Sequence, residues 1–141
     1  IIDVKEPKTL VSEKLVDNDK IKKVILCSGK VYYDLFEARA AKKIDDITII
    51  RVEQLYPYPQ EEIVKELKKY KNAEIIWCQE ESKNIGAWKF IEALIEKSLI
   101  DINHKSLRPK YVGRVASASP ATGYASYHKE EQETLINEAL K

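Results

Sequence analysis

Methionine is absent from this 141-residue sequence, and cysteine and histidine each occur only twice. Because the chain has no initiator methionine, we expect it to be a fragment of a longer protein. Cys27 and Cys78 each end an apolar run, which predicts buried, reduced thiols in a cytosol-like compartment. A metal or redox centre is not indicated, since there is no Cys-x-x-Cys spacing and only His104 and His128 could join the two thiols.

Long apolar runs and an excess of one charge are also missing. No run approaches the roughly 20 apolar residues of a membrane span, and no targeting segment is recognisable at the start. The formal net charge is +1, from 24 basic and 23 acidic residues that are interleaved along the chain. This pattern is not that of a nucleic-acid-binding or membrane-binding protein. The length predicts one domain with a substantial core.

Short apolar runs alternate with segments of helical period. This alternation predicts an α/β fold, with a mainly parallel sheet covered by helices on both faces. The runs lack polar alternation, as in strands that are buried on both sides. We expect strands at 9–11, 21–26, 47–52, 74–78 and 111–115, and helices at 31–43, 60–70, 84–99 and 128–140. Residues 24–141 are expected to form the domain, and residues 1–23 a less regular N-terminal segment.

The stretch from Ile75 to Trp88 is the most informative part of the chain. A short apolar run ends at Cys78 and is followed by polar Gln79, Glu80 and Glu81, after which Ser82 or Asn84 can cap a helix. Open α/β sheets place ligands beyond the carboxyl ends of their strands. The carboxylates are therefore candidates for acid–base chemistry or for holding a positive group of a partner, and the alternative is a solvated turn. We favour an interdomain contact over catalysis.

Two further loops are candidate binding sites. Ser28, Gly29 and Lys30 lie between a strand and a helix, where a helix N-terminus and a lysine attract anions. The same glycine also suits a plain tight turn, and the loop is neither a Walker motif nor a G-x-G-x-x-G.

Arg114, Ser117 and Ser119 are candidates for an anion-binding loop. A plain loop whose hydroxyl groups satisfy turn amides is equally compatible with this pattern. No set of residues provides a complete nucleophile, base and orienting group. The sequence therefore predicts one crevice and no self-sufficient catalytic centre.

Several motifs together resemble one family. They are C-S-G-K-V-Y-Y-D-L from Cys27, R-V-E-Q-L-Y-P-Y-P from Arg51, W-C-Q-E-E from Trp77, N-x-G-A-W from Asn84, G-R-x-A-S-A-S-P-A-x-G from Gly113 and H-x-x-E-Q-x-x-L-I-N-E-A-L from His128. In order and spacing they are similar to the C-terminal domain of the thiamin-dependent, decarboxylating component of 2-oxoglutarate dehydrogenase. The resemblance covers about residues 24–141.

This resemblance implies a transketolase C-terminal-like fold. Such a fold is a three-layer α/β/α sandwich around a five-stranded mixed sheet whose first strand is antiparallel to the others. The short strand near Thr9 would then be the antiparallel edge strand. The implied strand order also places the strands that contain Val24 and Ile75 side by side, so that Cys27 and Cys78 become neighbours.

The resemblance also implies a function. The complete enzyme of this family is a homodimer that decarboxylates 2-oxoglutarate with thiamin diphosphate and magnesium. It then passes the succinyl group to the lipoyl arm of the dihydrolipoyl succinyltransferase component, in the citric acid cycle. Preceding domains hold the cofactor, in keeping with the absence here of a G-D-G motif and a distant N-N pair. The compartment would be the bacterial cytoplasm or, in a eukaryote, the mitochondrial matrix.

No catalytic, cofactor-binding or metal-binding residue is therefore assigned, and the isolated fragment is expected to be inactive. Its implied roles are to close the dimer, to support the cofactor domains and, in some members, to bind an effector such as acetyl-CoA or AMP, with Lys30 and Arg114 as candidate contacts. We expect the interface to include Tyr56, Tyr58, Trp88 and the loop at 116–126. A relative that acts on 2-oxoadipate shares the motifs. The alternative is a stand-alone, flavodoxin-like nucleotide-binding regulatory module.

Overall fold

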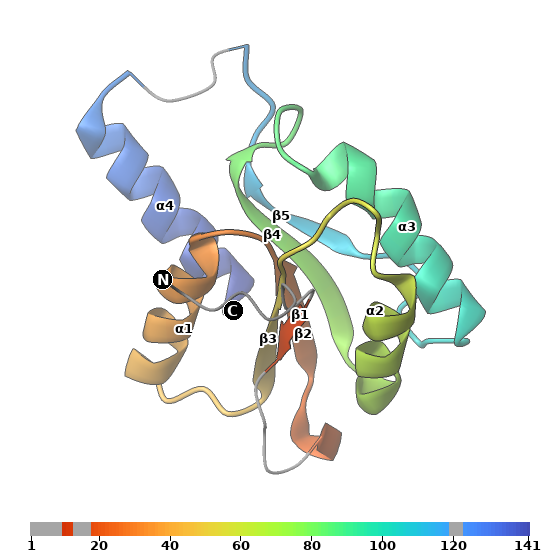
Figure 1. The fold of residues 1–141 in the computed structure, drawn as a ribbon. Helices are drawn as coiled ribbons and strands as arrows, with labels where there is room; N and C mark the ends of the chain where they lie inside the picture. Colours follow the sequence, from red (N-terminus) through yellow and green to blue (C-terminus); the bar gives the residue numbers. More distant parts are fainter. Residues whose placement is uncertain (1–9, 13–17, 119–122) are drawn as a thin grey trace, which may run out of the picture.

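A five-stranded sheet forms the centre of the domain (Figure 1). The structure, a computed structural model, describes residues 10–12, 18–118 and 123–141. The strands lie in the order β1-β3-β2-β4-β5. Four are parallel, and β1 pairs with β3 in the antiparallel direction. Their bounds are β1 Leu10–Ser12, β2 Lys23–Cys27, β3 Ile47–Val52, β4 Glu74–Ser82 and β5 Lys110–Arg114. The expected α/β fold with a mostly parallel sheet is confirmed; Thr9, where we expected the edge strand to begin, lies outside the described residues.

Four helices cover the two faces of the sheet and complete the three layers (Figure 1). Helices α1 (Val31–Ala41) and α4 (Ala125–Ala139) pack on one face, and α2 (Gln60–Leu67) and α3 (Trp88–Asp101) on the other. Successive strand residues point to opposite faces. Leu26 and Trp77 therefore enter the core beneath α2 and α3, whereas Cys27 and Cys78 enter the core beneath α1 and α4.

The two halves of the sheet diverge between β2 and β4. From β2 the chain passes through α1 to β3 on one side, and from β4 it passes through α3 to β5 on the other. Ligand crevices of open α/β sheets lie where the connections reverse in this way. Val24 pairs with Ile75 and Cys27 with Cys78 across the two strands, which confirms that these positions are neighbours. Both thiols are free and buried.

Several element boundaries differ from those expected. Strand β4 continues past Cys78 to Ser82, because Gln79 and Ser82 pair with β5 around an irregularity in the register. Helix α3 begins at Trp88 and not at residue 84, and its N-cap residue, Ala87, makes no side-chain capping bond. The expected cap by Ser82 or Asn84 is therefore wrong. Helix α2 ends at Leu67 in a 3-10 turn, and α4 begins at Ala125, before His128.

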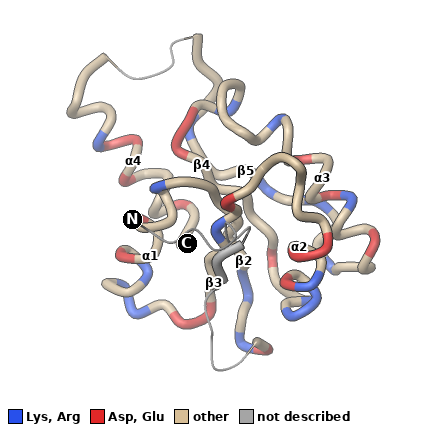
Figure 2. The backbone as a smooth tube through the Cα atoms, viewed as in Figure 1, with Lys and Arg blue, Asp and Glu red and all other residues tan. Residues whose placement is uncertain are grey.

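Charged residues are distributed over all four helices, and each helix carries both signs (Figure 2). Within the part of the chain that the structure describes, no helix is long and apolar enough to cross a membrane. The electrostatics of any one site therefore depend on local pairing, and not on a large field of one sign.

Candidate functional site

A crevice of about 580 Å³ lies at the carboxyl ends of β2 and β4, where the strand connections reverse. Mainly apolar residues and backbone line it: Ser28, Gly29, Leu55, Tyr56, Trp77, Gln79, Glu81, Ile85, Gly86, Ala87 and Phe90. Its volume falls within the roughly 300–1,000 Å³ of typical ligand pockets. The crevice brings together four of the candidate residues, Ser28, Gly29, Gln79 and Glu81, whereas Lys30 and Glu80 do not line it. Gly29 has a φ of 75°, a left-handed conformation that a residue with a side chain rarely adopts.

Gln79 lies at the floor of the crevice, where all the hydrogen-bonding groups of its side-chain amide have partners. Its Oε1 accepts hydrogen bonds from Trp77 Nε1 at 2.9 Å and from the Trp88 backbone N–H at 3.0 Å. Its Nε2 donates to the carbonyl oxygens of Glu81 and Ser82, at 3.2 and 3.1 Å. The amide thus satisfies a free N–H at the start of α3 in place of a local cap. Gln79 shapes the crevice and has no free group to offer a ligand.

Gly86 allows this arrangement. A Cβ at this position would lie less than 3 Å from three atoms of the Gln79 side-chain amide, a distance that real Cβ atoms do not tolerate. The glycine in the N-x-G-A-W motif is therefore required for the buried amide to approach the loop before α3.

The mouth of the crevice is an apolar rim formed by Tyr56, Ile85 and Phe90. Their exposed fractions are 83%, 46% and 45%, and the ring centroids of Tyr56 and Phe90 are 6.5 Å apart. Glu81 is the only charged residue among the described lining residues, and its carboxylate forms no ion pair or hydrogen bond with any described residue. The site thus combines exposed aromatic surface with one unpaired carboxylate.

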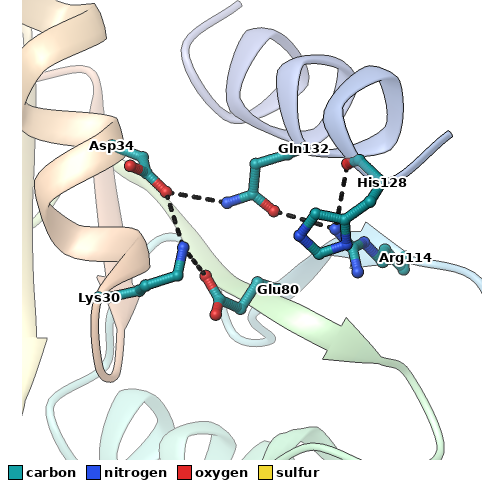
Figure 3. A network of polar contacts seen from close by, with 6 residues as sticks. All are labelled: Lys30, Asp34, Glu80, Arg114, His128 and Gln132. Atoms are coloured by element: carbon teal, nitrogen blue, oxygen red, sulfur yellow. Dashed lines mark hydrogen bonds and ion pairs between the residues drawn. The ribbon is translucent and has the colours of Figure 1, made fainter. Parts of the chain in front are cut away.

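A network of hydrogen bonds and ion pairs lies on the opposite face of the sheet (Figure 3). Lys30 Nζ lies 3.2 Å from Glu80 Oε2 and 3.5 Å from Asp34 Oδ2. Gln132 Nε2 donates to Asp34 Oδ2 at 2.9 Å, and Gln132 Oε1 accepts from Arg114 Nη2 at 3.2 Å. This network connects the loop after β2, helix α1, β4, β5 and α4.

Arg114 anchors the far end of this network. Its Nη2 donates to the carbonyl of His128 at 3.4 Å, and its Nε forms an ion pair with Glu131 Oε2 at 3.3 Å that lacks hydrogen-bond geometry. At the other end, the close contact with the Glu80 carboxylate raises the pKa of Lys30 above its usual value. Two cations and three carboxylates make up the network, so neither cation is free to attract a phosphate.

The remaining predicted site residues are dispersed. Asn84 clamps the backbone of Ser117: its Nδ2 donates to the carbonyl at 2.8 Å, and its Oδ1 accepts from the amide at 2.9 Å. Ser119 lies outside the described residues. Trp88 is buried in the core with its ring centroid 5.3 Å from that of Tyr111, so this chain alone does not expose it, and its place on an interface stays a prediction.

The other interface residues that we expected differ in exposure. Tyr56 is exposed, as stated above, whereas Tyr58 is half-buried, with its hydroxyl oxygen 2.9 Å from Ser98 Oγ. The described part of the loop at 116–126 is mostly exposed. Ile85 and Phe90 were not foreseen as surface residues. Helical spacing from Trp88 and Ile91, which face the core, would have placed Phe90 outward.

The titratable groups inside the fold do not form a reactive centre. Burial raises the pKa of Cys78 to about 12, and burial together with the neighbouring Cys78 raises that of Cys27 further. His104 is buried, with its Nε2 2.7 Å from the carbonyl oxygen of Tyr70. These thiols stay protonated and are poor nucleophiles.

The residues that the structure describes do not fit magnesium-bound thiamin diphosphate. Within the described ranges, no three histidine, cysteine, aspartate or glutamate side chains converge in a way that could hold a metal ion. The crevice offers a single carboxylate and no cation for a diphosphate. We therefore derive no catalytic step through this cofactor within the chain.

Comparison with known proteins agrees with the motifs. The family model described as 2-oxoglutarate dehydrogenase C-terminal matches residues 3–140. The 2-oxoglutarate dehydrogenase E1 components of Brucella anthropi, Brucella ovis and Brucella canis are each 50% identical over 127 residues, which is 90% of this chain. The chain spans only 13% of the length of these relatives. With its motifs, fold and family match in agreement, the chain belongs to the 2-oxoglutarate dehydrogenase C-terminal family.

Proposed function

We propose that this chain is the non-catalytic assembly domain at the C-terminal end of a 2-oxoglutarate dehydrogenase E1 component. In this proposal, the other domains of the enzyme bind thiamin diphosphate and magnesium and decarboxylate 2-oxoglutarate. The enzyme then transfers the succinyl group to lipoyl groups of the dihydrolipoyl succinyltransferase component. The present domain supports the cofactor domains and the homodimer, and alone it is inactive. Because the relatives compared are bacterial, we place the enzyme in the bacterial cytoplasm.

The apolar rim of Tyr56, Ile85 and Phe90 is the observation that carries this proposal. Large aromatic residues on a surface are enriched at protein interfaces, and a contiguous exposed apolar patch marks a contact surface. The rim surrounds a crevice in which the described residues bring no set of catalytic groups together. Both features fit a surface that packs against another part of the enzyme.

An effector such as acetyl-CoA or AMP is a second candidate ligand. The position of the crevice, between the loops after β2 and β4, favours it over the network of Lys30 and Arg114 as the effector site. In the network each cation already faces a carboxylate. The flavodoxin-like module is the remaining alternative, and the lack of a phosphate-binding glycine motif counts against it.

The assembly role can be tested in the complete E1 component that carries this chain. We expect the double variant Tyr56→Ser and Phe90→Ser to lower the dimer mass in sedimentation and to lower activity. The matched control is Leu107→Ser with Ile100→Ser, which removes two apolar side chains of 55% and 51% exposure at the opposite edge of the sheet. If both double variants keep the dimer and its activity, the rim is not an assembly surface.

The non-catalytic role has a separate test. Isothermal titration of this chain with thiamin diphosphate and magnesium should give no binding heat, and the same titration with AMP or acetyl-CoA tests the effector. Micromolar binding of thiamin diphosphate would contradict the proposal that the catalytic apparatus lies in other domains.

A further inference from the structure

We propose that the crevice binds the guanidinium group of an arginine that is presented by a polypeptide segment packed against the apolar rim. This inference rests on the proposed assembly function and specifies the chemistry of the partner surface. It commits to one occupant, an arginine-bearing segment.

The first argument is the state of Glu81. Glu80 and Glu81 are adjacent, but strand alternation turns them to opposite faces of the sheet. Glu80 pairs with Lys30 within the fold, whereas Glu81 points to the crevice and has no partner among the described residues. A lone carboxylate beside an apolar wall is complementary to a single positive group.

The second argument is the composition of the wall. Leu55 and Trp77 give the crevice an apolar interior, and Tyr56 and Phe90 place aromatic rings at its mouth. An arginine side chain matches both parts, because its methylene stem packs on apolar surface and its planar cation stacks on aromatic faces. A phosphate group matches neither part, since none of the described lining residues is a cation and Glu81 would repel the phosphate.

The third argument is the exposure of this surface. In the chain alone, Tyr56 is the most exposed of its large apolar side chains that the structure describes. Arginine is enriched, with aromatic residues, at the centres of protein interfaces. An arginine that packs against the rings would cover the rim and pair with Glu81 in one contact.

The test uses two peptides that differ only in charge. The peptide acetyl-Leu-Arg-Leu-amide is titrated into this chain and followed by NMR, and a second peptide carries neutral citrulline in place of arginine. We expect the arginine peptide to shift the signals of Trp77 Nε1–H, Gly86 and Ala87. We expect the citrulline peptide to bind about tenfold more weakly, through loss of the ion pair and the cation–π contact.

Two variants make the result specific to the crevice. Glu81→Gln should weaken binding of the arginine peptide and narrow its advantage over the citrulline peptide, because the variant loses the ion pair and keeps the cation–π contact. Glu80→Gln, one residue away on the opposite face, should leave both affinities unchanged. Added salt should weaken binding of the arginine peptide and spare the citrulline peptide.

Several outcomes would overturn the inference. Equal binding of the two peptides, equal effects of the two variants, or no saturable shift of these signals up to roughly 10 mM peptide would each do so. Shifts of the same signals by AMP, with both peptides silent, would identify a nucleotide site instead. The assembly proposal is judged separately by the Tyr56 and Phe90 variants of the complete enzyme, so either proposal can fail while the other stands.

Discussion

The two sides of the carboxyl edge of the sheet differ in how their charges are satisfied. On the side of α1 and α4, Glu80 pairs with Lys30 at one end of a polar network that reaches Arg114 through Asp34 and Gln132 (Figure 3). On the side of α2 and α3, Glu81 stands alone beside an apolar crevice whose aromatic rim is exposed. The sequence places these two glutamates next to each other, yet the fold gives them opposite environments.

This difference in charge pairing indicates which side of the sheet can bind a partner. A polar network with its charges paired connects elements that are distant in sequence and needs no further ligand. An unpaired carboxylate beside exposed aromatic rings is the arrangement of a surface that another molecule covers. The pairing of Lys30 and Arg114 therefore gives no support to an anion-binding role for them. The crevice beside Glu81, whose charge is negative, is the better candidate for a binding surface.

The largest expected effect on stability comes from replacing Gln79, the residue beneath the crevice. Gln79→Leu should lower the free energy of unfolding by about 3 kcal/mol, because the buried N–H groups of Trp77 and Trp88 lose their acceptor. Gln132→Leu, the matched change in the network, should lower it by about 1 kcal/mol, because its partners remain near solvent or other charges. Urea unfolding of the two variants measures this contrast. Equal losses would mean that the buried amide is no more important than the partly exposed one.

A smaller effect on the free energy of unfolding, which depends on pH, should come from Cys78 in the core beneath α1 and α4. Burial raises the pKa of Cys78 from 9.0 to about 12, so the folded state disfavours the thiolate that the unfolded chain forms readily. The stability linked to this thiol is fully present below pH 9 and is lost as pH rises toward about 12. In this window, the free energy of unfolding of the parent chain should fall about 1.4 kcal/mol per pH unit more steeply than that of Cys78→Ala.

The slope is the quantity to compare in that experiment, because Cys78→Ala also leaves a small cavity that lowers stability at every pH. Parallel curves for the two proteins would show that the thiol is not protected from ionisation. In the folded parent chain, neither Cys78 nor Cys27 should react with an alkylating agent at neutral pH.

The smallest expected effect compares the adjacent glutamates directly. Glu80→Gln should destabilise the fold by about 0.5 kcal/mol, the contribution of a partly exposed ion pair with Lys30. Glu81→Gln should leave the free energy of unfolding unchanged, since this carboxylate has no partner among the residues that the structure describes. Chemical unfolding at low and high salt measures both, and salt should diminish only the Glu80 effect. A loss of stability for Glu81→Gln would show that the carboxylate has a structural role.

Local patterns were sufficient to predict most of the fold. The apolar runs around Val24, Ile49 and Ile75 predicted buried strands, and the helical stripes between them predicted the covering helices. The edge strand and the pairing of Cys27 with Cys78 came from the family resemblance, because strand order depends on contacts between distant segments. The end of β4 was missed for the same reason: Gln79 is polar, and only its pairing with Gly113 of β5 keeps it in the sheet.

The order of amino acids alone was enough to indicate an α/β domain, its family and the loops that meet at the carboxyl edge. These features follow from hydrophobic periodicity and from local motifs. The packed structure was needed to show that Glu80 is paired and Glu81 is not, that Trp88 is buried, and that Arg114 is held by contacts with α4. The partners of these residues lie far away in the chain; Gln132 and Asp34, for example, are 98 positions apart. Which charges are paired and which remain free is a property of long-range packing, and that property separates a structural network from a surface that can receive a partner.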